Sequence, residues 1–247
     1  MRPLAALRVP TPAHILARPG DIADVAVISG DPARIEQLSK MLRDPKLVNT
    51  NRGFTTYTGY HGDKRVTLAT HGIGGPSTAI VVEELHMLGA KAIVRFGTAG
   101  GLVSGLGIGD FVVPTGAAYP RGSLTEYFEE GSLPAVPDFA LTQALIESCD
   151  RSDLKHREGL VYSSDGFYTQ DFVTLEPWVS RGVVAVEMEC ATLFTLGLLR
   201  RFRTAALLML SNSLVNKSEA DLAQAEKLKP FAAKGAAAIF DAVASLP

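Results

Sequence analysis

The sequence predicts an α/β fold, with a single domain over residues 1–247 whose mixed central β-sheet is covered by helices on both faces. Short apolar runs alternate along the chain with amphipathic segments of helical period, which is typical of strands that alternate with helices. Two strand-like runs follow each other directly, and this indicates a mixed rather than an all-parallel sheet. No linker rich in Pro, Gly or Ser divides the chain, so we expect one domain.

The chain begins its alternation with a predicted strand at residues 24–30, "DVAVISG", which ends in glycine. The next segment, 31–42, predicts a helix because its proline comes early and its apolar residues have amphipathic spacing. Residues 52–72 indicate a hairpin with the polar turn "HGDK". These segments therefore predict three strands and one covering helix.

The middle of the chain continues the pattern. Residues 76–89 predict a helix that Ser77 caps and Gly89 ends. Residues 92–102, "AIVRFGTAGGL", predict a buried strand that runs into a glycine turn, and residues 109–119 predict another strand.

The C-terminal half repeats the alternation. A predicted helix at 137–149 precedes a predicted strand at 159–165. The run "VVAVEMEC" indicates a strand at 183–190 that continues as a helix at 191–202. The remaining elements are a last strand and C-terminal helical segments interrupted near Pro230, at residues 205–213 and 222–246.

The composition is that of an ordinary soluble globular protein, with 47% hydrophobic and 20% charged residues. The net charge of −2 gives no electrostatic reason to expect nucleic acid or an anionic membrane as a partner. Cys149 and Cys190 have no metal-binding spacing, so we expect a reduced, cytoplasmic protein without a metal. Prolines interrupt the N-terminal segment and no apolar run approaches ~20 residues, so we expect neither a signal peptide nor a membrane span.

Small and polar residues follow several of the predicted strands. Ligands of open α/β sheets gather at the carboxyl ends of strands. The strand ends are Gly30-Asp31, Gly97-Thr98, Ser163-Ser164-Asp165, Glu187-Met188-Glu189 and Ser211-Asn212. Their convergence predicts one binding site.

Two arginines lie close to these strand ends. Arg95 is flanked by apolar residues in "AIVRFGT", and a buried guanidinium needs an anionic partner. That partner is either a phosphate or carboxylate ligand, or a structural acid such as Glu84 or Glu187. Arg34 stands near a predicted helix N-terminus, which favours anions, although a solvated helix arginine is the alternative.

The other candidate residues each have two interpretations. Glu189 has the chemistry to accept hydrogen bonds from vicinal sugar hydroxyls, or it is a structural acid at a strand–helix junction. Phe167 and Tyr168 are able to stack on a planar base, or they are core aromatics. His14 is typical of a surface histidine, and Cys190 of a small core residue rather than a nucleophile.

Six motifs occur in a fixed order: "SGDPARIEQL", "NRGFTTYTG", "THGIGGPSTAIVVEELHMLGA", "VRFGTAGGL", "LPAVPDF" and "VEMECATLFTL". Together they resemble the nucleoside phosphorylase superfamily, which includes purine nucleoside, methylthioadenosine and uridine phosphorylases. The resemblance runs from about residue 12 to the end of the chain. It implies the nucleoside phosphorylase fold and phosphate-dependent cleavage of an N-glycosidic bond, which gives a free base and ribose 1-phosphate.

The resemblance also implies a phosphate site. Gly30 and Arg34 of "GDPAR" match its first half, and Arg95 and Thr98 of "RFGT" match its second half. Arg52 of "NRGF" matches a further arginine that reaches in from the neighbouring subunit.

Ribose and base contacts are implied in the same way. Glu189 and Met188 of "VEMEC" match the residues that hold ribose. His14 of "PAHILA" matches a histidine of the partner subunit that contacts the 5′ end of the sugar, and Phe167 matches the aromatic residue against the base. Glu187 is not the main ribose ligand of these enzymes, and we interpret it as structural.

The implied mechanism needs inorganic phosphate as co-substrate and no metal or organic cofactor. Three arginines fix the phosphate, so proximity and electrostatics supply much of the catalysis, with Arg95 and Glu189 as the expected catalytic residues. The shared residues imply a dimer as the smallest competent unit and a hexamer built as a trimer of dimers. Residues 1–20 are expected to contribute to the subunit interface.

The preferred base is open between uracil and a purine. Purine-cleaving relatives carry an aspartate where this chain has Asn212, and uridine phosphorylases carry asparagine there. Uridine phosphorylases bind uracil with a glutamine, which Gln170 matches, and with an arginine two residues later. In this chain Asp171 and Phe172 follow Gln170, so that arginine is missing. We favour uridine, with a purine nucleoside or 5′-methylthioadenosine as the alternative.

Two other functions remain as rivals. A nucleosidase would cleave the same bond with water, and it would not need the phosphate-clamping arginines. A non-catalytic nucleoside-binding protein would need no phosphate site at all.

Overall fold

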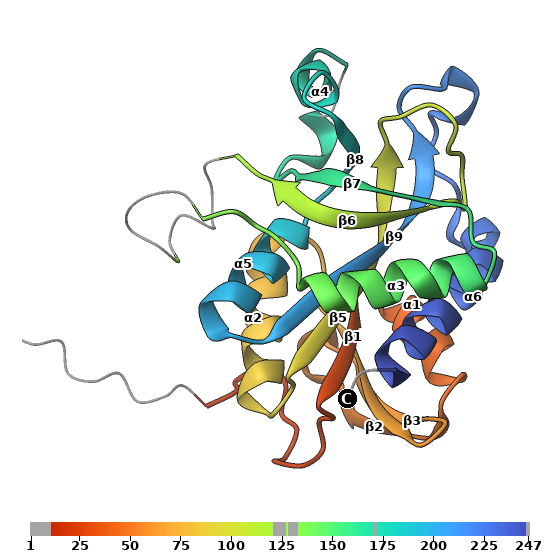
Figure 1. The fold of residues 1–247 in the computed structure, drawn as a ribbon. Helices are drawn as coiled ribbons and strands as arrows, with labels where there is room; N and C mark the ends of the chain where they lie inside the picture. Colours follow the sequence, from red (N-terminus) through yellow and green to blue (C-terminus); the bar gives the residue numbers. More distant parts are fainter. Residues whose placement is uncertain (1–10, 121–126, 128–132, 170–171, 246–247) are drawn as a thin grey trace, which may run out of the picture.

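The computed structural model describes residues 11–120, 127, 133–169 and 172–245 (Figure 1). Its strands are β1 (Val25–Ser29), β2 (Arg43–Asn49), β3 (Thr56–His61), β4 (Lys64–Thr70), β5 (Ala92–Gly101), β6 (Phe111–Ala118), β7 (His156–Ser163), β8 (Val183–Glu187) and β9 (Arg203–Ser213). They form one sheet in the order β2-β3-β4-β1-β5-β8-β7-β6-β9, and β5 also pairs with β9.

The sheet is mixed, as predicted. β1 runs parallel to β4 and β5, whereas β3 and β4 form the predicted antiparallel hairpin. β5 pairs with β8 on one edge and with β9 on the other, and β8, β7, β6 and β9 pair in succession. The last five strands therefore close into a ring, and β5 belongs to both the ring and the open part of the sheet.

Helices cover the two faces of the sheet (Figure 1): α1 (Pro32–Ser39), α2 (Gly75–Met87), α3 (Phe139–Arg151), α5 (Cys190–Arg200) and α6 (Ala225–Ala244). The short helix α4 (Phe172–Val179) lies apart from them and packs against β8. In β1, Ala26 and Ile28 pack into the core with α2 and α5, whereas Val25 and Val27 pack with α1, α3 and α6. The alternation arises because successive strand side chains point to opposite faces. The predicted fold class is confirmed.

Two local predictions are wrong. Ser77 does not cap α2, because its hydroxyl donates to the His71 carbonyl at 2.5 Å, and Gly74, with φ 85°, precedes the helix instead. Pro230 does not interrupt the C-terminal helix, because α6 runs through it. Pro230 has no N–H to donate to the Glu226 carbonyl, so α6 continues with one backbone hydrogen bond missing.

The sequence reading also missed two elements, β2 and α4. β2 is an edge strand with mostly exposed residues, so its sequence "RDPKLVN" has no apolar alternation. α4 contains Pro177, a residue that argues against a helix interior.

Across the described residues, no helix combines the length and the apolar character that a membrane crossing needs.

Candidate active site

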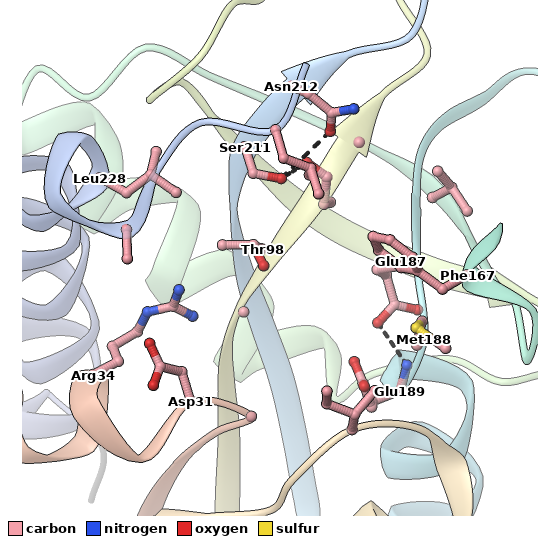
Figure 2. A pocket seen from close by; sticks show the side chains of 18 of the residues that line it. Asp31, Arg34, Thr98, Phe167, Glu187, Met188, Glu189, Ser211, Asn212 and Leu228 are labelled. Carbon is pink, nitrogen blue, oxygen red and sulfur yellow. Dashed lines mark hydrogen bonds between the residues drawn. The ribbon is translucent and has the colours of Figure 1, made fainter. Parts of the chain in front are cut away.

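A cavity of about 690 Å³ lies at the carboxyl ends of β1, β8 and β9 (Figure 2). The C-terminal half of β5 also lines it. Eight of the residues predicted to bind phosphate, ribose or base line it: Gly30, Arg34, Arg95, Thr98, Phe167, Met188, Glu189 and Asn212. The fold therefore brings together residues from four of the five predicted strand ends, although Gly97 and Thr98 lie within β5 rather than at its end. The fifth, Ser163-Ser164-Asp165, does not line the cavity.

Two of the predicted residues that the structure describes do not line this cavity. His14 and Arg52 lie together elsewhere on the chain: Asn51, next to Arg52, donates from Nδ2 to the His14 carbonyl at 3.0 Å. The His14 ring packs edge-on against Phe54, with 6.0 Å between the ring centroids. Gln170 lies outside the described residues.

Arg95 is buried in β5 and forms ion pairs with both glutamates of the "VEMEC" motif. One end of its guanidinium contacts Glu189, and the other lies 3.5 Å from Glu187 Oε2. Burial opposes the charge of Arg95, but the two carboxylates outweigh it and raise the pKa. Glu84, the other acid considered as its partner, binds residues 13–15 instead.

Glu187 has a structural place in this arrangement. Its carboxylate accepts hydrogen bonds from the Ser163 hydroxyl and from the backbone N–H groups of Glu189 at 2.8 Å and Cys190 at 2.9 Å. These bonds tie the start of α5 to the end of β7. Burial raises the pKa of the Cys190 thiol well above its ordinary value, so the thiol stays protonated, as expected for a core residue.

Glu189 stands at the N-terminus of α5 with both oxygens engaged. Oε1 accepts the N–H of Gly74 at 2.7 Å, and Oε2 accepts from Arg95. Burial raises the pKa of Glu189, but Arg95 outweighs it and the net pKa is lowered, so the carboxylate is ionised. Because each carboxylate oxygen has two lone pairs, both retain room to accept a ligand hydroxyl.

Two glycines make this packing possible. The guanidinium of Arg95 lies over Gly97, where a Cβ atom would sit 2.0 Å from Nη1. A Cβ atom at Gly30 would sit 2.7 Å from the carbonyl oxygen of Gly72. The glycines of "GDPAR" and "RFGT" are therefore required for close approach.

Arg34 reaches the cavity from the first turn of α1 (Figure 2). Its Nη1 donates to the Ser29 hydroxyl at 3.2 Å, and its guanidinium lies 5.7 Å from the centroid of the Phe96 ring. Burial lowers the pKa of Arg34 and Asp31 offsets this in part. A half-buried cation whose hydrogen-bond partner is a neutral hydroxyl is suited to an anionic ligand.

Thr98 and Met188 enter the cavity from different elements (Figure 2). Thr98 comes from β5 and brings a hydroxyl, while Met188 follows β8 and brings a polarisable apolar surface. No group of three or more His, Cys, Asp or Glu suited to a metal ion occurs within the described ranges.

His71 is a residue of this region that the sequence reading did not single out. It is fully buried, and burial, aided by the charge of Arg95, lowers its pKa to about 3. Its Nδ1 lies 3.1 Å from the Thr78 hydroxyl, while Nε2 has no hydrogen-bond partner among the described residues. The available signal was its position in "ATHGIGG", directly after a strand.

The remaining wall of the cavity is mainly apolar. It is lined by Val186, Leu214, Leu222, Ala223, Ala225 and Leu228. Asn212 lies beside it and donates from Nδ2 to the Ala220 carbonyl at 3.1 Å, so its amide supports the segment before α6. Of the predicted aromatic pair, Phe167 lines the cavity and Tyr168 is 98% exposed.

The chain is similar in sequence to known proteins. The chain matches the family described as the phosphorylase superfamily over residues 24–246. It is 37% identical to a uridine phosphorylase of Treponema pallidum (strain Nichols), over 83% of this chain and 84% of the relative. It is 34% identical to a guanosine phosphorylase of Halorubrum lacusprofundi, over 84% of this chain and 87% of the relative.

A solved structure agrees at the level of the fold. The crystal structure of a uridine phosphorylase from Vibrio fischeri ES114 superimposes with a TM-score of 0.85 and covers 97% of this chain and 100% of its own. The sequence identity is 24%, so the likeness establishes the fold alone.

Proposed function

The chain belongs to the phosphorylase superfamily, and we propose that it is a nucleoside phosphorylase that cleaves uridine to uracil and ribose 1-phosphate. One observation carries the proposal: Arg34 and Arg95 line the same cavity as the carboxylate of Glu189. A cavity with two cationic groups and one ionised acid has separate regions for an anion and for a polyol.

Phosphate is proposed to bind between α1 and β5. Arg34, with its neutral hydrogen-bond partner, and the guanidinium of Arg95 supply positive charge, while Thr98 and the backbone at Gly30 supply further donors. A phosphate oxygen then bonds to C1′ of ribose as the C1′–N bond breaks, and the electron pair leaves with the base. The site's contribution is to hold nucleophile and sugar in line and to stabilise the separating charges.

Ribose is proposed to bind over Met188, with its 2′- and 3′-hydroxyls on Glu189. The lowered pKa of Glu189 supports this role, because an ionised carboxylate accepts two hydroxyl protons. Its bond to Arg95 also puts the sugar and phosphate subsites in direct contact.

The base is proposed to lie between Phe167 and the apolar wall, and Gln170 is proposed to read uracil. A leaving pyrimidine develops charge on its carbonyl oxygens and N3, so neutral donors are sufficient. Asn212 suits this chemistry, because an amide donates hydrogen bonds but does not act as an acid.

The decisive test is a phosphorolysis panel. Purified protein is incubated with uridine, thymidine, inosine, guanosine, adenosine or 5′-methylthioadenosine, with and without phosphate, and free base and pentose 1-phosphate are quantified. Phosphate-dependent release of uracil, faster than release of any purine, is the expected result. Release of base without phosphate would favour a nucleosidase, and binding without release would favour a nucleoside-binding protein.

A purine nucleoside is the second candidate because one relative is named guanosine phosphorylase at 34% identity. Against it, the residue beside the apolar wall is Asn212 and not the aspartate that would protonate N7. Faster release of guanine or hypoxanthine than of uracil would establish this alternative.

We propose that the active site is shared between subunits of a dimer, in a hexamer of three dimers. His14 and Arg52 lie outside the cavity of their own chain, and Asn51, next to Arg52, binds the His14 carbonyl, which suits residues that serve a neighbouring site. We further propose that phosphate is the only co-substrate, that no cofactor takes part and that the enzyme works in the cytoplasm. Both cysteines are free and buried, in keeping with a reducing compartment.

A further inference from the structure

Glu84, on the third turn of α2, binds a short stretch of the N-terminal segment through all of its acceptor capacity. Oε1 accepts the backbone N–H of Ala13 at 3.0 Å, and Oε2 accepts those of His14 at 3.0 Å and Ile15 at 2.6 Å. Oε1 also lies 2.7 Å from Nδ1 of the His14 ring. A single carboxylate thus binds three consecutive backbone amides and one imidazole.

This arrangement is ionised and largely shielded from water. Glu84 is 7% exposed, and burial alone would raise its pKa, but the hydrogen bonds from Ile15 and the His14 ring lower it. Two asparagines extend the same anchor: Asn51 donates to the His14 carbonyl, and Asn49 accepts the N–H of Leu16 at 3.0 Å. The backbone of residues 13–16 is therefore fixed from several sides.

The contact also determines the hydrogen-bonding character of His14. An ionised carboxylate accepts but never donates, so the ring nitrogen facing Glu84, Nδ1, carries the proton. In the neutral ring Nε2 is then left as an acceptor. A ligand group that donates an O–H, such as the 5′-hydroxyl of ribose, is what this nitrogen is prepared to bind.

α2 carries a second relevant contact at its other end. The N–H of Gly74, immediately before the helix, donates to Glu189. Gly74 and Glu84 are ten residues apart, which spans about 15 Å of helix. One rigid element thus holds the ribose carboxylate of its own chain and the segment that carries His14.

We propose that Glu84 is a positioning residue for the sugar: it orients His14 and fixes its Nδ1–H tautomer, so that Nε2 accepts the 5′-hydroxyl of the nucleoside in the neighbouring subunit. The inference rests on the proposed function. Glu84 acts through His14 and does not touch the substrate.

Glu84→Gln removes the charge at constant size, and its amide directs N–H groups at backbone donors. We expect kcat/KM for uridine to fall roughly tenfold or more, the effect of losing one or two hydrogen bonds, while KM for phosphate stays unchanged. With 5′-deoxyuridine, which has no 5′-hydroxyl, variant and wild type should be equal. His14→Ala should cause the same loss, and the double variant should lose no more.

Glu83→Gln is the matched control. Glu83 is the neighbouring residue in α2 and pairs with Arg200 at 2.7 Å, on a different face. It should leave both substrates unaffected. If Glu84→Gln lowers uridine and 5′-deoxyuridine cleavage equally, the positioning role is overturned and Glu84 only anchors the chain.

A second measurement does not depend on Glu84→Gln. Nitrogen-15 NMR of the folded wild-type protein, with the His14 signals assigned by His14→Ala, reports which ring nitrogen carries the proton. We expect Nδ1–H near neutral pH, and an Nε2–H tautomer would overturn the proposal even if Glu84→Gln does not fold. Wild-type protein that cleaves no nucleoside would overturn the proposed function and the 5′-hydroxyl role, whereas the tautomer result would separately decide the Glu84–His14 contact.

Discussion

The side chains of Arg95 and Glu189 contact each other inside the protein, where solvent reaches only 5% and 6% of their surfaces. The two residues come from different motifs and are assigned to different substrates, phosphate and ribose. Their ion pair couples the two subsites, so a change at one residue alters the electrostatics of the other. Mutations must therefore be compared with matched controls that separate binding from stability.

Arg95→Ala is expected to lower both stability and activity. Breaking a buried ion pair leaves Glu187 and Glu189 uncompensated, which costs about 3–5 kcal/mol of unfolding free energy. Arg34→Ala is the matched variant, because Arg34 donates to the Ser29 hydroxyl rather than to an acid. It should raise KM for phosphate roughly tenfold with a smaller change in Tm. Kinetics at varied phosphate and thermal unfolding test both, and an unchanged phosphate KM in folded Arg34→Ala would contradict the assignment.

Glu189→Gln is expected to weaken uridine binding and slow turnover, because a neutral amide keeps one acceptor oxygen and loses its attraction for Arg95. Glu187→Gln is the control. It disturbs the bonds to Ser163 and to the start of α5, so it should lower Tm more than it alters the kinetics of the folded fraction. If Glu189→Gln instead loses stability while its kinetics stay normal, Glu189 is structural.

Asn212→Asp is expected to raise cleavage of purine nucleosides relative to uridine by supplying a proton donor for N7. It also removes the N–H that binds the Ala220 carbonyl, so some stability is lost. Asn212→Ala loses the same bond without adding an acid. A gain in inosine or guanosine cleavage by the aspartate variant and not by the alanine variant is the expected outcome, and equal behaviour of the two would refute it.

His71 is expected to make the protein less stable in acid. Its folded pKa of about 3 lies below the ordinary 6.5, so its unfolded form binds a proton first as the pH falls. The contribution of His71 to the free energy of unfolding is fully present above pH 6.5 and is lost as the pH falls toward 3, by up to ~1.4 kcal/mol per pH unit. The groups acting on His71 are Arg95, Arg34 and Glu189.

The test of this acid effect is urea unfolding at fixed protein concentration between pH 7 and pH 4. His71→Asn keeps a polar side chain but does not titrate. Its unfolding free energy should fall less steeply with acid than that of the wild type. If the unfolding free energies of the two proteins fall in parallel with pH, other groups cause the loss of stability in acid.

Arg52→Ala and Glu189→Gln chains are expected to complement each other when mixed. Each variant damages a different half of a site shared between subunits, so a hybrid dimer would contain one site with both residues intact. Activity after mixing and subunit exchange should exceed the sum of the separate activities. Hybrids detected by mass spectrometry that remain inactive would argue against a shared site.

Several elements were predictable because their cause is local. The continuous apolar run Val25, Ala26, Val27 and Ile28 indicates a strand buried on both faces, and the structure has it between two layers of helices. The β3–β4 hairpin follows from its polar turn in the same way. β2 was not predictable, because an edge strand is held by its pairing with β3 and not by a buried face.

The candidate site divides along the same line. Motifs identified its residue types, since glycines at 30 and 97, an arginine at 95 and glutamates at 187 and 189 are recognisable from their spacing. Which acidic side chain pairs with which basic side chain was not recognisable from the sequence. Glu84 was a candidate ion-pair partner of Arg95, but its carboxylate binds residues 13–15. The reason is that α2, which carries Glu84, packs against the N-terminal segment, whereas Arg95 on β5 faces the acids that precede α5.

The sequence by itself determined the family, the mixed α/β sheet and the residues gathered at its strand ends, because these depend on periodicity and on short motifs. Only the tertiary structure decided that Arg95 is held by both Glu187 and Glu189, that His71 is buried and uncharged under the influence of Arg95, and that Glu84 binds His14. The physical reason is that hydrogen bonds and ion pairs act over a few ångströms between groups that lie far apart in the chain. Their pairing is fixed by how strands and helices pack, and no local pattern encodes it.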